Sequence, residues 1–233
     1  MQNCMIFCKI FKQHCLFLRY KATKPPMKTL FVTVFTFLTL TVLAQKDPVA
    51  KQLLDQIGAK VKASKGILVN ISLTSKNNKG KILGAKQIAL QMKGDKYLLK
   101  EGKMEILCDG VNIYNFDGIN SISKSNVAES DQTLSPQKLL SGNYDKDFNF
   151  KLLSQDNTKA TIELYPIDKR KSFQKVTLVI NKQQSALSSA LILDKSNNLT
   201  DVKVGSINYA ASLNDKLFLF NRAKYPKNAE IFD

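Results

Sequence analysis

Short segments in which apolar residues alternate with polar ones recur along most of this chain, and each ends in residues that favour a turn. In residues 67–74, for example, every second side chain is isoleucine, valine or leucine, which is typical of a strand with one buried face. The pairs Asp109-Gly110 and Asp117-Gly118 have the composition of tight hairpin turns. This repeated pattern restricts the chain to a largely antiparallel β fold.

A long run of hairpins with so little helix predicts a mainly β fold with a few helices. We expect a strongly curved antiparallel sheet or unclosed β-barrel of about ten strands that is covered by two amphipathic helices. The expected strands are 67–74, 82–92, 96–100, 104–108, 111–116, 121–123, 150–153, 158–165, 173–181, 190–194 and 199–209. The expected helices are 48–64 and 135–140.

The first helix has a clear start and a clear apolar side. Asp47 can cap its N-terminus, and Pro48 suits the first helical position. Apolar residues then follow at spacings of three and four, which places them on one side of the helix. We expect this side to cover the sheet as a lid, through Leu53, Leu54 and Ile57.

An apolar run before this region has the features of a secretory signal peptide. Lys28 gives it a positive start, residues 29–43 are uncharged and mostly apolar, and Val42 and Ala44 suit a cleavage site. The run is shorter than the roughly 20 residues of a spanning helix, although a retained anchor remains an alternative. No cysteine follows the run directly, so cleavage would release the protein without a lipid anchor.

The sequence therefore divides into three parts. Residues 1–26 contain no acidic residue, and we interpret them as a mis-assigned start or an extended positive segment of the signal. Residues 27–44 are the expected signal peptide. Residues 45–233 are expected to form one exported domain, because no linker-like segment interrupts them.

The exported part is basic, but its positive charge is spread out. The whole chain has 35 basic and 19 acidic residues, of which residues 1–44 hold six basic and no acidic ones, leaving a net charge of +10 for residues 45–233. Nucleic-acid readers concentrate arginine and lysine on one face beside aromatic side chains, so we expect no nucleic-acid partner. Attraction to an anionic membrane surface or an acidic partner fits better.

The residues that most enzymes need are missing from the exported part. Its sequence has no histidine, which excludes Ser-His-Asp and Cys-His catalysis and histidine-ligated metals. Cys108 alternates with apolar residues and is expected to be a buried apolar side chain. Asp145 and Asp147, like Glu129 and Asp131, lie in polar stretches and are expected at the solvated surface. We expect no catalytic residue, no metal and no cofactor.

Three motifs follow one another in residues 47–233. They are the Asp109-Gly110 hairpin followed by Tyr114, the helix 135–140 ending in Leu139-Leu140, and the tail Phe218-Leu219-Phe220 with Tyr225-Pro226. Their order after an Asp-Pro helix resembles the periplasmic outer-membrane lipoprotein carrier family, LolA. The family's well-known forms are rich in tryptophan and have an arginine on an early strand, whereas this chain has no tryptophan and has Lys93, Gly94 and Asp95 near the matching place.

The resemblance implies a function as well as a fold. Members of that family form an unclosed β-barrel covered by helices, and they shield the acyl chains of a lipoprotein on its way from the inner to the outer membrane. By resemblance, this protein would be a monomeric periplasmic carrier with acylated lipoproteins as its cargo. Its partners would be an inner-membrane lipoprotein-releasing transporter and an outer-membrane acceptor.

Such a carrier needs a concave apolar face or cavity, and the alternating strands supply candidates for it. The residues that we expect to line it are Val69, Ile71, Leu73, Ile88, Leu90, Met92, Ile162, Leu164, Val176, Leu178 and Ile180. Met92 adds a flexible side chain, which suits acyl chains of variable shape.

Two other functions remain open at this point. The same fold could serve as a sensory or regulatory module that binds an acylated ligand without transporting it. An esterase or glycosidase with unrecognised carboxylates is the third alternative, and the missing histidine argues against it.

Overall fold

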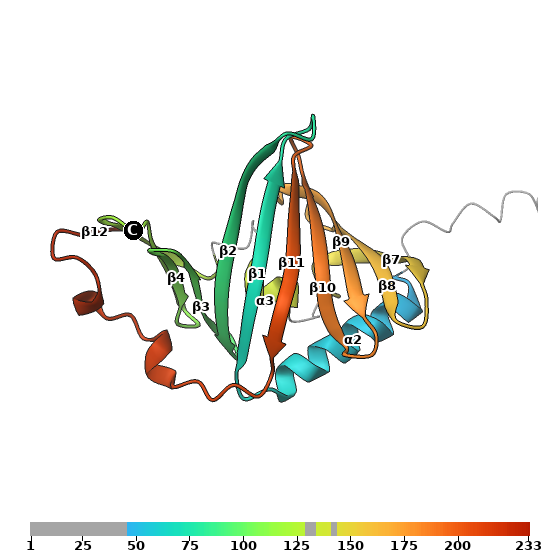
Figure 1. Cartoon of the computed structure of the whole chain (residues 1–233), viewed down its shortest axis with the longest axis horizontal. Helices are drawn as coiled ribbons and strands as arrows, with labels where there is room; N and C mark the ends of the chain where they lie inside the picture. Colours follow the sequence, from blue (N-terminus) through green and yellow to red (C-terminus); the bar gives the residue numbers. More distant parts are fainter. Residues whose placement is uncertain (1–45, 129–133, 141–143) are drawn as a thin grey trace, which may run out of the picture. The chain divides into compact units, whose positions relative to one another are not determined.

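The strands of this protein join into one sheet, which the computed structural model describes for residues 46–128, 134–140 and 144–233 (Figure 1). The strand order is β12-β6-β5-β4-β3-β2-β1-β11-β10-β9-β8-β7. The strands are β1 (Ile67–Lys76), β2 (Ile82–Lys93), β3 (Lys96–Glu101), β4 (Met104–Cys108), β5 (Asn112–Phe116), β6 (Ser121–Asn126), β7 (Phe148–Gln155), β8 (Lys159–Pro166), β9 (Phe173–Asn181), β10 (Ala186–Asp194), β11 (Leu199–Asn208) and β12 (Glu230–Phe232). The helices are α2 (Pro48–Ala63) and α3 (Pro136–Leu140), and two 3-10 helices follow, η2 (Asp215–Phe218) and η3 (Arg222–Lys224).

These elements belong to one compact unit, Ala44–Asp233. The segment 1–26, the expected signal peptide 27–44, Glu129 and Asp131 lie outside the described residues. Among the residues that are described, no helix is both long enough and apolar enough to cross a membrane.

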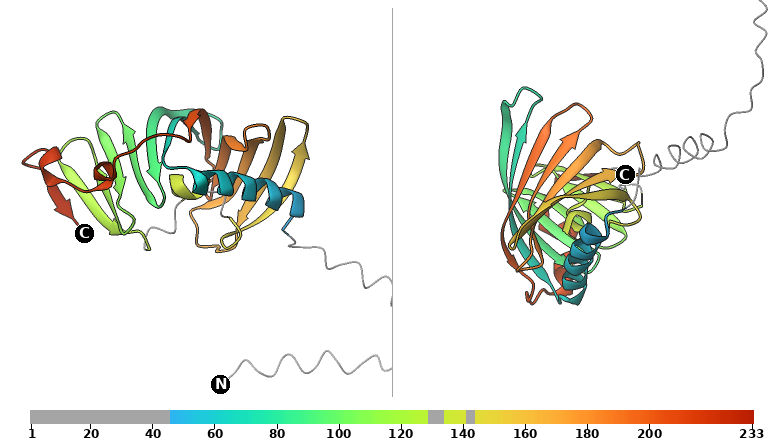
Figure 2. Two further views of the ribbon diagram at one scale, coloured as in Figure 1. Left: turned by 90° about the horizontal axis from the view of Figure 1, so that it is seen from below. Right: turned by 90° about the vertical axis from the view of Figure 1, so that its right-hand side faces the viewer.

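Two runs of antiparallel hairpins meet in the middle of the sheet. One run leads from β1 to β6, and the other leads from β7 to β11, which pairs with β1. The edge strands, β7 and β12, are at opposite ends of the strand order, so the sheet is curved but not closed (Figure 2). The expected fold class, an unclosed curved sheet covered by two helices, is confirmed.

Predicted and observed elements agree closely. β4 and β9 have the predicted bounds, and no end of the other predicted strands differs from the observed one by more than four residues. The sequence pattern missed β12, which pairs in parallel with β6. Its three residues are all exposed, so no alternation marks them as a strand.

α2 begins and ends where its capping residues predict. The Asp47 carboxylate accepts hydrogen bonds from the backbone N–H groups of Val49, at 2.9 Å, and Ala50, at 3.0 Å. Pro48 occupies the first turn, where its missing N–H is no loss. Ser64 ends the helix, and its hydroxyl donates to a carbonyl of the last turn at 2.6 Å. The buried side of α2 comprises Ala50, Leu53, Leu54, Ile57 and Gly58.

The Asp-Gly turns have the geometry that their sequence predicts. The Asp117 carboxylate accepts hydrogen bonds of 2.8 to 3.0 Å from the backbone N–H groups of residues 119–121. Gly118 has a φ of +85°, and a Cβ there would lie 3.1 Å from the backbone of Lys103, so only glycine fits. Hairpin geometry thus accounts for this turn, and within the described residues no three His, Cys, Asp or Glu side chains are grouped to hold a metal ion.

The C-terminal segment, residues 213–229, packs on the face of β3–β6 that points away from α2. Phe218 is fully buried there against Leu98 and Leu107. Phe220 stacks on Tyr114 with the ring centroids 4.2 Å apart. Figure 1 shows this segment in red, running past β3 and β4 toward β12. The part of the sheet formed by β3–β6 therefore has a second layer on its outer side.

Candidate functional site

The sheet has one continuous apolar face, which we call the inner face and define as the face that α2 covers. The cross-strand pairs on it include Val69–Leu90 and Ile71–Ile88 between β1 and β2, and Ile162–Leu178 and Leu164–Val176 between β8 and β9. All eleven residues predicted for the face belong to one apolar cluster, together with Leu53, Leu54 and Ile57 of α2. Ten of the eleven are buried, and Leu73 is half-buried. The structure thus brings every predicted face and lid residue together.

Beneath α2 the inner face is packed. Four side chains on β8 and β9 have no exposed surface at all: Ile162, Leu164, Val176 and Leu178. A gap large enough for water beside any of them would leave measurable accessible surface, so none adjoins these residues. An apolar molecule can therefore reach β8 and β9 only if the side chains that pack on them move.

The inner face continues past α2 onto β3, β4 and β5. Leu99 pairs with Leu90 on one side and with Ile106 on the other, which places all three side chains on the same face. Ile113 pairs with Cys108 in the next row. Leu99, Ile106 and Ile113 are only half-buried, although they pack against the main apolar cluster. This region is therefore an accessible part of the inner face among the described residues.

The sequence analysis did not include these three residues among the candidates. Their alternation is visible in the sequence, in Met104–Cys108 for example, so a signal was present. The pattern shows which residues share a face, but it does not show which strands α2 crosses. The degree of cover over β3–β5 therefore had to come from the structure.

An ion pair attaches the N-terminal half of α2 to the loop between α3 and β7. The Lys51 ammonium lies 2.5 Å from Oδ2 of Asp145. Lys46 donates a hydrogen bond to the backbone carbonyl of Asp145, and its ammonium is 3.7 Å from Oδ1 of the carboxylate. Asp145 is thus not merely a solvated surface residue, as its polar surroundings suggested. It attaches α2 to the loop before β7.

These contacts shift the acid-base behaviour of both partners. The hydrogen bond from Lys51 lowers the pKa of the Asp145 carboxyl. The same hydrogen bond raises the pKa of Lys51, and the neighbouring Asp55 adds to that increase. Both groups therefore stay charged across the neutral pH range. Asp147 is likewise paired, with Lys138 at 2.8 Å.

The C-terminal half of α2 is attached through a single lysine. The Lys60 ammonium donates a 2.5 Å hydrogen bond to the backbone carbonyl of Gln184, in the turn between β9 and β10. It also lies 4.3 Å from the centre of the Tyr209 ring, which is a cation–π contact. Polar contacts therefore hold α2 near both ends, while apolar contacts hold its middle.

An aromatic group supports the loop that carries Asp145. Tyr144 is buried, and its hydroxyl donates to the backbone carbonyl of Leu139 in α3. Its ring meets Phe148 edge-on, with centroids 5.8 Å apart, and Phe148 in turn stacks on Phe173. Burial raises the pKa of the Tyr144 hydroxyl, so it stays neutral and acts as a hydrogen-bond donor.

The one cysteine of the described residues is also held neutral. Cys108 is buried on the inner face, as predicted, and burial raises the pKa of its thiol. Burial raises the pKa of the Tyr97 hydroxyl to about 12, and the electrostatic effect of the nearby Cys108 is a smaller cause of the same increase. Neither side chain supplies a nucleophile at neutral pH. The inner face thus offers apolar contact rather than acid-base chemistry.

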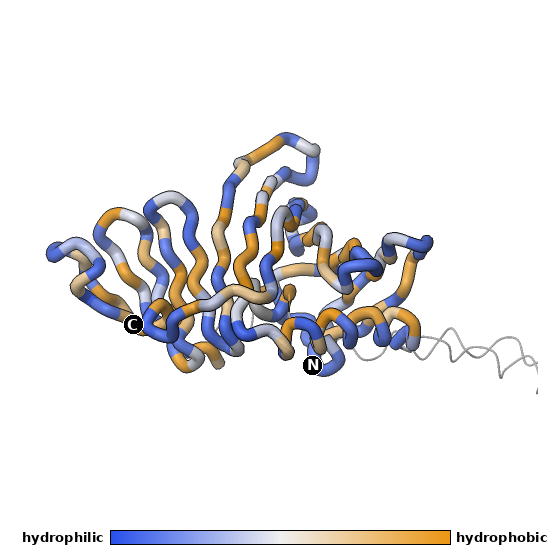
Figure 3. Tube along the Cα trace, turned by 60° about the horizontal axis from the view of Figure 1, so that its bottom comes forward, coloured by the Kyte–Doolittle hydropathy of each residue, from blue (hydrophilic) through white to orange (hydrophobic). Residues whose placement is uncertain are grey.

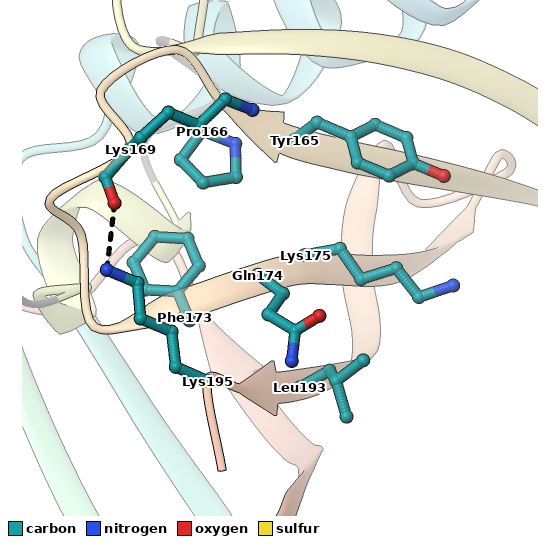
Figure 4. A pocket seen from close by; sticks show the side chains of 8 residues that line it. All are labelled: Tyr165, Pro166, Lys169, Phe173, Gln174, Lys175, Leu193 and Lys195. Carbon is teal, nitrogen blue, oxygen red and sulfur yellow. Dashed lines mark hydrogen bonds between the residues drawn. The ribbon is translucent and has the colours of Figure 1, made fainter. Parts of the chain in front are cut away.

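A shallow groove of about 440 Å³ opens on another part of the sheet (Figure 4). Its lining comprises Tyr165, Pro166, Lys169, Phe173, Gln174, Lys175, Leu193 and Lys195. The Lys175 ammonium is bound to Glu163 at 2.5 Å, and the Lys195 ammonium donates to the Lys169 carbonyl at 2.8 Å. Two of its three lysines are therefore engaged within the protein, and the groove is a weaker candidate than the inner face.

Comparisons with solved structures find similarity to distantly related chains. An uncharacterized conserved protein from Thermus thermophilus is 12% identical, with a TM-score of 0.53 over 78% of this chain and 98% of that one. A LolA superfamily protein from Nitrosomonas europaea is 14% identical, with a TM-score of 0.45 over 73% of this chain and 97% of that one. The Mycobacterium tuberculosis lipoprotein LppX is 16% identical, with a TM-score of 0.42 over 72% and 100% of the two chains. Of these three, the Thermus protein alone has a TM-score above 0.5, and at 12% identity the likeness shows a shared fold and nothing more.

The sequence itself gives the family. A search of curated proteins finds no match. The family described as Outer membrane lipoprotein carrier protein LolA, however, matches residues 100–221, which is just over half of the chain. These residues run from the end of β3 through the crossover at α3 to the segment that packs Phe218 on the sheet. This protein therefore belongs to the LolA family.

Proposed function

We propose that this protein is a periplasmic carrier, or chaperone, that shields lipoprotein acyl chains against its inner face and moves them from the inner to the outer membrane. The observation that supports this most is the inner face itself, a continuous apolar surface that α2 covers in part. Membership of the LolA family supports the choice of cargo.

The energetics require a surface of this kind. Transfer of an acyl chain of about 16 carbons from a membrane into water costs roughly 12 kcal/mol of free energy, at about 0.8 kcal/mol per methylene. Lipoproteins with two or three such chains need an apolar partner in water. The half-buried Leu99, Ile106 and Ile113 offer the first apolar contact, and the eleven predicted residues extend it to β8 and β9.

α2 has to move for an acyl chain to reach the deeper part of this face. Its polar attachments, Lys51 to Asp145 and Lys60 to Gln184, are partly exposed and can exchange for contacts with water at small cost. The apolar contacts of Leu54 and Ile57 contribute more free energy than these polar attachments, but an incoming acyl chain replaces them. Exchange of helix for acyl chain keeps the face away from water throughout.

The remaining parts of the proposal concern delivery. The expected signal peptide, residues 27–44, would export the single domain 45–233 to the periplasm. There it would act as a monomer, receive cargo from an inner-membrane lipoprotein-releasing transporter and pass it to an outer-membrane acceptor. We propose a binding protein rather than an enzyme, because residues 45–233 contain no histidine and the inner face is lined by apolar side chains.

The experiment is to incubate the chain from Gln45 to Asp233 with spheroplasts whose lipoprotein-releasing transporter is active. Native mass spectrometry of the supernatant then looks for a soluble complex with an acylated lipoprotein. A stoichiometric complex is the expected result. If the supernatant contains only free protein while a known carrier releases lipoproteins from the same spheroplasts, the carrier proposal is wrong.

A pair of variants ties the result to the inner face. Ile106→Asn places an amide on the half-buried part of that face, and we expect it to reduce the yield of complex about tenfold. Val111→Ser changes a side chain that is 62% exposed at the β4–β5 turn, and it serves as the control. Binding of a synthetic acylated peptide without any release from spheroplasts would instead favour the sensory or regulatory alternative.

A further inference from the structure

The end of the β1–β2 hairpin projects beyond the strand next to it. β3 pairs with β2 only from Ala89 to Lys93, and all six residues of β2 before Ile88 are exposed. We call residues 76–83 the hairpin tip. In Figure 1 it is the highest point of the sheet.

Two adjacent apolar side chains of the tip are exposed to solvent. Ile82 is 60% exposed and Leu83 is 61% exposed. The pairing of β1 with β2 shifts register here, from Lys76–Ile82 to Ser75–Gly84, so Leu83 is an extra residue at a β-bulge. A medium that surrounds the tip covers both Ile82 and Leu83.

The tip is also strongly basic. Lys76, Lys79 and Lys81 lie in or beside its turn, and the sequence from residue 56 to residue 94 contains no acidic residue. Figure 3 shows a hydrophilic turn next to an apolar stretch at the end of this hairpin. The positive charge of the lysines complements the anionic headgroups of a membrane surface, and the exposed apolar side chains beside them complement its apolar boundary.

The tip has a defined conformation that keeps these side chains outside. The Asn77 side chain accepts hydrogen bonds from the backbone N–H groups of Lys79, at 3.0 Å, and Lys81, at 2.9 Å. The backbone N–H of Asn77 donates to the Lys81 carbonyl at 2.9 Å. Gly80, at a φ of +78°, completes the turn. Insertion of the tip would therefore require no rearrangement of the hairpin.

We propose that the hairpin tip is a membrane-docking element that inserts Ile82 and Leu83 into the interface of an anionic lipid bilayer while its lysines contact the headgroups. An anionic bilayer is the occupant that the tip favours, because exposed apolar side chains beside lysines complement both its apolar boundary and its headgroups. This surface is separate from the inner face. The proposal therefore holds whether or not the protein carries lipoproteins.

The test is co-sedimentation of the chain from Gln45 to Asp233 with lipid vesicles. This part forms a compact unit with its own core, and it lacks the apolar run 29–43, which would bind lipid by itself. We expect binding to vesicles that contain phosphatidylglycerol, much weaker binding to pure phosphatidylcholine, and weakening by salt. No binding to the anionic vesicles would overturn the proposal.

Two double variants with matched controls locate the contact. Ile82→Ser with Leu83→Ser is expected to weaken partitioning at least about tenfold, whereas Ile119→Ser, at a turn position that is 72% exposed, leaves it unchanged. Lys79→Gln with Lys81→Gln is expected to weaken it about tenfold or more, compared with little change for Lys216→Gln with Lys224→Gln on the C-terminal segment. All seven substituted residues are exposed, and thermal unfolding checks that the fold is intact.

The remaining outcomes decide against the proposal. Equal binding by the tip variants and the wild type would mean that the net charge of the whole domain is responsible. Tip-dependent binding to native membranes that disappears after protease treatment, without binding to pure lipid vesicles, would assign the tip to a membrane protein instead.

Discussion

The ammonium of Lys51 lies 2.5 Å from the carboxylate of Asp145, and this contact joins α2 to the loop between α3 and β7. The two residues are 94 positions apart in the sequence. The same ammonium contacts Asp55, one helical turn further along α2, at 3.0 Å. Lys51 therefore has one partner that attaches α2 to the rest of the protein and one partner within α2.

Replacement of Asp145 is expected to loosen the lid helix without unfolding the protein. Asp145→Asn removes the charge that attracts Lys51 and Lys46, while the packing of Leu54 and Ile57 stays in place. Hydrogen exchange of the α2 amides should become several-fold faster, because partly exposed ion pairs contribute little but measurably to local stability. Mass spectrometry of peptic fragments measures this directly.

Asp55→Asn is the matched control for that change. It removes the other carboxylate partner of Lys51, but one that lies on the same helix. Exchange in α2 should then stay within about twofold of the wild type. Equal acceleration in both variants would show that helix propensity, and not attachment to the loop, governs the exposure of α2.

The attachment of α2 should depend on pH at both extremes. Asp145 has a lowered pKa, so its contribution is complete above the unfolded pKa of about 4 and is lost as the pH falls through the lower folded value. Lys51 has a raised pKa, so its contribution is complete below about pH 10.5 and is lost as the pH rises beyond that. The difference in α2 exchange between wild type and Asp145→Asn should therefore be constant at neutral pH and shrink below about pH 4. A difference that already changes near pH 6 would contradict this assignment.

The sequence pattern predicted the sheet because alternation is a local property. Every strand with a buried face, such as β9, was visible from its own residues, and so was α2 from its caps and spacing. The shared inner face followed from the same alternation. Hence all eleven predicted residues lie in one cluster in the structure.

The missed features depend on long-range placement. The contact of Lys51 with Asp145 arises because a loop that is remote in sequence lies beside α2. The position of Phe218 on Leu98 and Leu107 likewise depends on where an irregular segment passes over the sheet. Whether the inner face is packed or open depends on the distance between α2 and the strands, and residue patterns do not encode that distance.

Packing beneath the lid leads to a prediction about stability. Leu178 has no exposed surface, so Leu178→Ala is expected to destabilise the fold by about 2–5 kcal/mol, through lost apolar burial and the cavity left behind. Leu191 lies on β10 and is 40% exposed, so Leu191→Ala should change the free energy of unfolding by less than about 1 kcal/mol. Urea unfolding compares the two. A cost below about 1 kcal/mol for Leu178→Ala would mean that this part of the inner face is open in solution.

The C-terminal segment is expected to stabilise the sheet through one main anchor. Phe218 is fully buried against Leu98 and Leu107, whereas its neighbour Leu219 is 55% exposed. Phe218→Ala should lower the free energy of unfolding by about 3–5 kcal/mol, and Leu219→Ala should change it by no more than about 0.5 kcal/mol. Urea unfolding followed by tyrosine fluorescence measures both. Similar values for the two variants would show that the segment does not pack on β3–β6 in solution. If only Phe218→Ala is destabilising, the outer side of these strands needs this segment as its second layer.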